Sequence, residues 1–142
     1  MEDISSILNK VDLDIIQLHG NENVDDYTIF NKDIINTIHA SENIQSQLSK
    51  INLNKHMHLI DATDNQMRGG SGITFDWNIL KDLDCEKLFI DGGLKPDNIL
   101  DLLSRYTPKC VDVSSGIERK VGYKDHKIMS DFVETIRTYY EK

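Results

Sequence analysis

Glycine-bearing turns follow several short apolar runs in this sequence, and two of these turns carry residue types that bind anions. The fourth apolar run is followed by Gly92 and Gly93, and the fifth is followed by Ser114, Ser115 and Gly116. Glycine lets backbone N–H groups approach an anion closely, and a following helix N-terminus adds a favourable potential. Two such turns in succession predict a phosphate site, with ordinary turn-making as the alternative for each.

Other polar residues stand at corresponding places after earlier runs. Asp61 ends the third run, where the residues alone favour a carboxylate that caps the following loop. His19 follows the first run and could hold a ligand, orient a neighbour or serve as a structural turn histidine. The segment that contains Gly70, Ser71 and Gly72 lacks the Lys-Ser/Thr pair of a P-loop, so a Walker-type nucleotide site is excluded.

No metal site is predicted from residue spacing. Four further histidines lack the paired spacing of metal ligands and are expected to be structural or exposed: His39, His56, His58 and His126. Cys85 precedes the fourth apolar run and Cys110 begins the fifth, so both are expected to be buried, unreactive thiols.

The apolar runs have the spacing of parallel strands joined by helices. Their centres lie 20, 24, 30 and 22 residues apart, at Ile15, Ile35, Leu59, Phe89 and Val111. Apolar periodicity and capping residues predict helices from Asp3 to Lys10, from Ser41 onward, from Pro96 to Leu103 and from Asp125 to Tyr140. One helix followed by five βα repeats predicts an α/β protein, either a doubly wound sheet or part of a barrel.

Length and charge set the broad class. The 142 residues predict a single domain, residues 1–142, without a linker or a shift in composition. A net charge of −8 disfavours nucleic acid and anionic membranes as partners. The apolar runs are far shorter than a membrane span, and the acidic N-terminus is unlike a secretory signal, so a cytoplasmic location is expected.

Five motifs together resemble phosphoribosylanthranilate isomerase, an enzyme of tryptophan biosynthesis. In chain order they are QLHGNE, LIDA, GGSGITFDW, GGLKPDN and VDVSSGIE followed by GYKDHKI. The resemblance implies a (βα)8 TIM barrel, of which this chain carries the fourth through eighth strands. It also implies an Amadori rearrangement of N-(5′-phosphoribosyl)anthranilate to a 1-deoxyribulose phosphate, an aldose–ketose isomerisation without a metal or organic cofactor.

The resemblance also assigns roles to residues. Asp61 becomes the general acid that protonates the ribose ring oxygen, and Asp112 faces the barrel interior near the anthranilate, with a buried polar support as its alternative. The phosphate of a small substrate is expected at Gly92, Gly93, Ser114, Ser115 and Gly116, with His19, Gly70, Ser71 and Gly72 as further binding residues. One departure weakens this cradle: Asp91 stands where the family has a small Ala, and its carboxylate repels phosphate unless it turns away or is protonated.

The family's catalytic base is a cysteine in a Lys-Ile-Cys-Gly strand, and nothing similar precedes Val11. A truncated enzyme, weakly active or inactive alone, is therefore expected, with the N-terminal barrel part or a second copy as its partner. Two alternatives stay open at this point. One is a catalytically inactive remnant that binds a phosphorylated ligand or a partner. The other is a doubly wound phosphate-binding domain, whose strand order would reverse.

Overall fold

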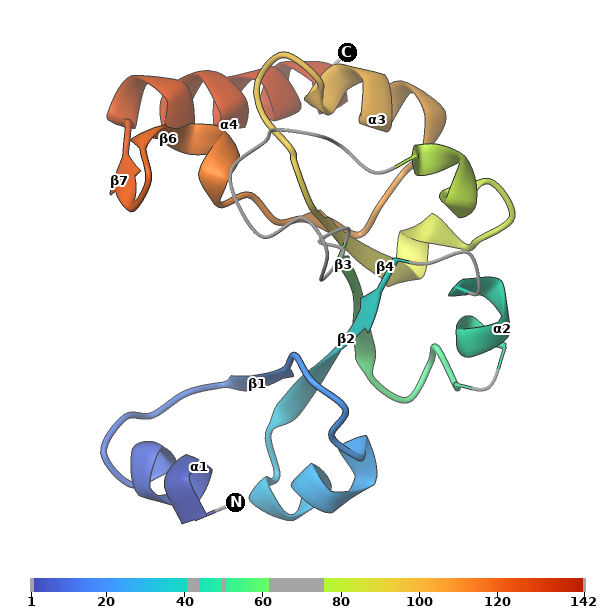
Figure 1. Cartoon of the computed structure of the whole chain (residues 1–142), viewed down its shortest axis with the longest axis vertical. Coiled ribbons are helices and arrows are strands. Elements are labelled where there is room, and N and C mark those ends of the chain that lie inside the picture. Colours follow the sequence, from blue (N-terminus) through green and yellow to red (C-terminus); the bar gives the residue numbers. More distant parts are fainter. Residues whose placement is uncertain (1, 41–43, 50, 62–75, 142) are drawn as a thin grey trace.

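Five parallel strands form one sheet, and each strand pairs with the strand that follows it in the sequence (Figure 1). They are β1 (Ile15–Leu18), β2 (Asp33–His39), β3 (Met57–Asp61), β4 (Leu88–Asp91) and β5 (Cys110–Val111). The computed structural model describes residues 2–40, 44–49, 51–61 and 76–141. The strand order β1-β2-β3-β4-β5 does not reverse, so the doubly wound alternative is wrong. The α/β class and the five predicted strands are confirmed.

The register of the strands decides which side chains share a face of the sheet. β2 pairs with β3 so that His39 lies beside Asp61, and β3 pairs with β4 so that Asp61 lies beside Asp91. Paired residues of neighbouring strands point to the same face, so these three polar residues line one face at its carboxyl edge. One step earlier in each strand, the side chains point to the opposite face and are buried: Ile38, Ile60 and Ile90.

Helices cover that opposite, apolar face. The largest core cluster joins the strand isoleucines to α2 (Ile44–Leu48), α3 (Ile99–Arg105) and α4 (His126–Tyr140). In Figure 1, α3 and α4 lie together at one end of the molecule, and the Tyr139 hydroxyl donates a hydrogen bond to the Leu103 carbonyl at 2.8 Å. Each buried Leu or Ile side chain contributes about 1.5–3 kcal/mol. The packing of these helices therefore holds the strands in place, and the helices do not cover the face that carries His39, Asp61 and Asp91.

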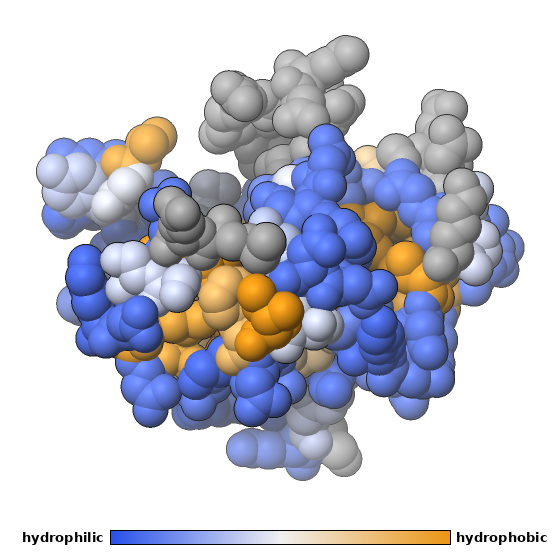
Figure 2. Space-filling model, turned by 90° about the horizontal axis from the view of Figure 1, so that it is seen from below, coloured by the Kyte–Doolittle hydropathy of each residue, from blue (hydrophilic) through white to orange (hydrophobic). Residues whose placement is uncertain are grey.

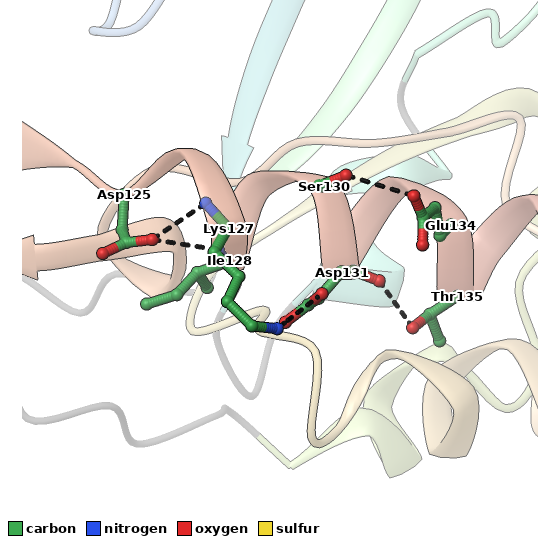
Figure 3. Close-up of polar contacts among 7 residues, drawn as sticks. All are labelled: Asp125, Lys127, Ile128, Ser130, Asp131, Glu134 and Thr135. Atoms are coloured by element: carbon green, nitrogen blue, oxygen red, sulfur yellow. Dashed lines mark hydrogen bonds and ion pairs between the residues drawn. The ribbon is translucent and has the colours of Figure 1, made fainter.

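Local sequence explains why α4 begins where it does. Asp125 is its N-cap, and the Asp125 carboxylate accepts hydrogen bonds from the backbone N–H groups of Lys127 at 2.9 Å and Ile128 at 3.2 Å (Figure 3). On the exposed side of the helix, Lys127 pairs with Asp131 one turn later, at 2.8 Å. The predicted start of this helix is confirmed.

The N-terminal end of the sheet has its own small core. α1 (Glu2–Leu8) and the 3-10 helix η1 (Val24–Phe30) pack against buried residues of β1 and β2. Figure 2 views the molecule from this end and shows apolar side chains at the surface among polar ones. Large apolar residues of the first thirty positions that stay exposed are Ile7, Val11, Leu13, Ile15 and Ile29. None of the helices in the described ranges is long and apolar enough to cross a membrane.

Three local features differ from the predicted elements. The connection after β1, for which the βα pattern predicted a helix of unspecified bounds, forms the 3-10 helix η1, and α3 begins at Ile99 because Lys95 to Asn98 first form a turn. A short antiparallel hairpin, β6 (Glu118–Lys120) and β7 (Tyr123–Lys124), precedes α4 and was not predicted. Ser41, the expected start of the second helix, lies outside the described residues; the helix itself spans Ile44–Leu48.

Candidate active site

A carboxylate and two imidazoles meet at the carboxyl ends of β1, β2 and β3. Asp61 ends β3 and is only 2% exposed. The Nε2 atom of His19, which directly follows β1, lies 3.1 Å from Asp61 Oδ2, and the Nδ1 atom of His39 at the end of β2 lies 3.9 Å from the same oxygen. The two imidazole rings meet edge to face, with centroids 5.4 Å apart. The structure thus gives Asp61 a buried position beside two groups that can exchange protons.

Asp91 extends this polar row to β4, where it is the register partner of Asp61. The pKa of Asp91 is raised to about 6: burial is the largest cause and the neighbouring carboxylates of Asp112 and Asp61 add to it, while a hydrogen bond from Gly92 and the nearby His19 oppose the rise. Three carboxylates therefore gather at this edge. The charge on Asp91 changes close to neutral pH.

The turn after β4 is built on two glycines and on hydrogen bonds within the turn. Gly92 and Gly93 both have positive φ, 113° and 64°, which non-glycine residues rarely adopt. The Gly92 N–H donates to its neighbour Asp91 Oδ1 at 2.6 Å. Asn98 fixes the rest of the turn: its amide donates to the Gly93 carbonyl and its side-chain oxygen accepts from the Lys95 N–H, each at 2.9 Å. The Asp91 carboxylate therefore occupies a donor that a phosphate would otherwise use.

The turns after β4 and β5 touch each other through their backbones. A Cβ atom added to Gly116 would lie 1.7 Å from the carbonyl oxygen of Leu94, far inside van der Waals contact. Only glycine fits at this position without moving one of the two turns. The predicted phosphate residues on these two strands are therefore neighbours in space.

A lysine stands at the second turn. The Lys124 ammonium lies 2.8 Å from the Ser114 carbonyl oxygen and 3.1 Å from the Ser114 hydroxyl oxygen. It also pairs with Glu118 at 2.8 Å, which partly neutralises it. Ser114 and Ser115 are exposed, and Ser115 opens the 3-10 helix η4 (Ser115–Ile117). This turn therefore offers an anion two accessible serines and a nearby cation.

Two expectations about β5 are wrong. Asp112 was predicted mid-strand, but β5 ends at Val111 and Asp112 lies just beyond it, where its N–H still donates to the Ile90 carbonyl at 2.8 Å. Asp112 is exposed, so the alternative of a buried polar support is wrong, whereas its place beside the anthranilate stays a prediction. Cys110 was expected to be buried and is exposed, because β5 pairs only with β4 among the described strands. Cys85 is buried as predicted, and burial raises the pKa of its thiol.

Some candidate residues cannot be compared with the structure. Gly70, Ser71 and Gly72 were predicted to bind substrate and lie outside the described residues. The structure brings His19 to Asp61 and joins the two glycine-bearing turns.

Sequence reasoning missed His39, Asn98 and Lys124. His39 had no signal, because its position beside Asp61 depends on strand register. Asn98 and Lys124 lie within the quoted motifs GGLKPDN and GYKDHKI, which were the available signal for both.

Comparison with known proteins gives one consistent family. The family model described as N-(5′-phosphoribosyl)anthranilate (PRA) isomerase matches residues 1–135. A curated N-(5′-phosphoribosyl)anthranilate isomerase of Oceanobacillus iheyensis is 40% identical over 139 residues, which cover 96% of this chain and 67% of the relative. The enzyme of that name from Legionella pneumophila (strain Corby) is 37% identical over 134 residues, covering 94% of this chain and 65% of the relative. The chain therefore spans about two thirds of the length of these relatives.

Solved structures agree with this result. Phosphoribosyl anthranilate isomerase from Thermotoga maritima superimposes with a TM-score of 0.79 at 27% identity, covering 96% of this chain and 68% of that one. A second structure, of the isomerase in complex with reduced 1-(o-carboxyphenylamino)-1-deoxyribulose 5-phosphate, gives a TM-score of 0.73 at 27% identity, covering 96% of this chain and 66% of that one. Sequence and fold lead to the same conclusion: this chain belongs to the N-(5′-phosphoribosyl)anthranilate isomerase family.

Proposed function

We propose that this chain supplies the fourth through eighth strands of a TIM barrel that isomerises N-(5′-phosphoribosyl)anthranilate in the cytoplasm. The observation that carries the proposal is the register pairing of Asp61 with Asp91. This pairing puts a buried acid one strand away from the Gly92–Gly93 turn. In a barrel enzyme the reacting end and the phosphate of a small substrate bind at this same face of the sheet.

In the proposed reaction Asp61 is the general acid. Its proton goes to the ribose ring oxygen as the bond from that oxygen to C1 breaks, which leaves an open-chain iminium ion (a protonated Schiff base). A base then removes the proton from C2, and tautomerisation gives the 1-deoxyketose. His19, 3.1 Å from Asp61, orients the carboxyl group. By family resemblance the base is a cysteine on the first strand of the barrel, which is no part of the described sheet.

The remaining residues bind the substrate. Backbone N–H groups of the two glycine-bearing turns, other than that of Gly92, which donates to Asp91, hold the phosphate together with the hydroxyls of Ser114 and Ser115. Asp112, exposed at the end of β5, lies on the anthranilate side. The family resemblance implies that Gly70, Ser71 and Gly72 also bind substrate.

The test uses a completed barrel. The first three βα units of the Oceanobacillus iheyensis relative are fused to this chain, and turnover of N-(5′-phosphoribosyl)anthranilate is measured. The fusion is expected to be active, and Asp61→Asn should lower kcat by about 100-fold or more with little change in KM, because an amide cannot deliver the proton. Asp14→Asn is the matched control, since Asp14 is exposed before β1.

The 142-residue chain alone should have no measurable isomerase activity, because a general base typically contributes about 10²- to 10⁴-fold. An Asp61→Asn fusion that keeps most of its kcat would remove Asp61 from the mechanism. An inactive fusion that still binds phosphate would instead favour a binding protein without catalysis.

A further inference from the structure

We propose that His19, His39 and Asp61 form a binding site for a divalent first-row transition metal, with Zn²⁺ as its representative. This binding goes beyond the proposed isomerisation: it uses Asp61 and His19 of the same site but needs no substrate. Each of the three residues offers one ligand atom, and these atoms all lie within 4.8 Å of one another. Two imidazoles and one carboxylate are a donor set typical of Zn²⁺ and related ions, whereas Mg²⁺ and Ca²⁺ prefer oxygen ligands alone.

The distances are compatible with a shared ion. Ligand atoms at about 2.0–2.1 Å from a tetrahedral Zn²⁺ lie about 3.3 Å from one another. The separation between His19 Nε2 and Asp61 Oδ2 is 3.1 Å, and that between His39 Nδ1 and Asp61 Oδ2 is 3.9 Å. The distance between His39 Nδ1 and Asp61 Oδ2 is too long for a hydrogen bond, and it would have to shorten by about half an ångström for the two atoms to bind one ion.

His39 supplies a second observation. Its Nδ1 atom is shielded from solvent and has no hydrogen-bond partner among the residues that the structure describes. A buried, unsatisfied nitrogen is costly, and a metal ion between His39 and Asp61 would satisfy it. The ring is placed by register, because His39 and Asp61 are partners on adjacent strands. The Ala40 N–H also donates to the Asp61 carbonyl at 2.7 Å, which fixes the spacing of the two strands at this point.

The surroundings favour a cation. Asp91 lies beside Asp61 on β4, and Asp112 is close enough to Asp91 to affect its titration. Three protein ligands leave one coordination position open, as in catalytic rather than structural zinc sites. A bound ion would hold the Asp61 carboxylate as a ligand, so metal binding and proton donation by Asp61 would exclude each other.

Calorimetry with ZnCl2 and the absorption of Co²⁺ on the purified 142-residue chain test the proposal. We expect one ion per chain and visible Co²⁺ bands of tetrahedral type, which a hundredfold excess of Mg²⁺ does not displace. His39→Asn and Asp61→Asn should each weaken binding at least about 100-fold, since loss of even an outer-sphere partner costs about 10- to 100-fold. His126→Asn is the matched control because His126 is exposed on α4, and it should bind as the wild type does.

Imidazole ¹⁵N NMR of the wild-type chain gives a readout that does not depend on the folding of any variant. Zn²⁺ should shift Nε2 of His19 and Nδ1 of His39, the two atoms that face Asp61. Binding that survives His39→Asn would overturn the proposal. So would zinc shifts confined to other histidines, displacement by Mg²⁺, or no binding by a chain whose circular dichroism shows it folded. Because none of these measurements uses the isomerase substrate, their failure leaves the proposed catalysis untouched.

Discussion

Replacing Asp91 with Asn is expected to stabilise the protein at neutral pH. The pKa of Asp91 rises from 3.8 to about 6 in the folded chain, chiefly through burial. The folded state therefore binds a proton more tightly than the unfolded state does. Between about pH 4 and pH 6 the folded chain carries more protons, so the free energy of unfolding falls as pH rises through this window. Above about pH 6, Asp91 is ionised in the folded protein, and its partly buried charge lowers the free energy of unfolding by the full amount.

The size of the effect follows from the shift. About two pKa units at 1.36 kcal/mol each give an upper limit of about 3 kcal/mol. Asp91 is only partly buried, so solvent screening reduces this to about 1–2 kcal/mol. An Asn side-chain oxygen can still accept the Gly92 hydrogen bond, so Asp91→Asn removes the charge and little else.

Urea unfolding at pH 4.5, 5.5 and 7.0 measures the effect. The Asp91→Asn chain should be about 1–2 kcal/mol more stable than the wild type at pH 7.0, and at pH 4.5 the difference should fall to about a third to a half of that. Asp14→Asn, an exposed aspartate outside the site, should leave the pH dependence unchanged. An Asp91→Asn chain that shows the wild-type pH dependence, or is less stable at pH 7.0, would contradict the reasoning.

Three further substitutions test the turns and the last helix. Gly116→Ala should lower the free energy of unfolding in urea by at least about 2 kcal/mol, because the new Cβ would lie 1.7 Å from a backbone carbonyl oxygen. Gly122→Ala should lower it by only about 1 kcal/mol, because Gly122 has a φ of 77° but open space around it. Equal losses for the two variants would contradict the packing argument. Gly93→Val should abolish the NMR shifts that inorganic phosphate induces at residues 92–94 and 114–118, since a β-branched residue resists a φ of 64°, and unchanged shifts would mean that the turn is no cradle. Asp125→Ala should lower the free energy of unfolding by about 1 kcal/mol through loss of the N-cap, and exposed Ser130→Ala should not; a negligible loss for Asp125→Ala would show that packing alone starts the helix.

The sheet was predictable because its strands are short apolar runs that recur along the chain. Runs such as His58 to Ile60 stand out against polar loops, and a spacing of 20 to 30 residues admits parallel strands rather than hairpins. The hairpin Glu118–Lys124 was not predictable in this way, because it is polar, exposed and stabilised by Lys124 pairing with Glu118. Its turn glycine, Gly122 with φ of 77°, was the only local signal.

The candidate site was predictable only where a residue's place follows from its own strand. Asp61 and the Gly92–Gly93 turn come directly after apolar runs, so their position at the carboxyl edge could be expected. His39 could not be assigned to the site, because its contact with Asp61 depends on how β2 is aligned with β3. A shift of one residue in that register would turn His39 to the helix-covered face. Hydrophobic periodicity alone does not fix such an alignment.

The sequential strand order also has a consequence for folding kinetics. Each strand finds its partner in the next strand along the chain, so no pairing in the described sheet has to wait for a distant segment. The connections between successive strands are 14 to 26 residues long, and the entropy of closing them grows only slowly with length. The sheet can thus grow from β1 toward β5 while the chain is still being synthesised. The β4–β5 pairing and the docking of α4 on α3 would come last, so substitutions in α4 should mainly speed unfolding and leave the refolding rate nearly unchanged.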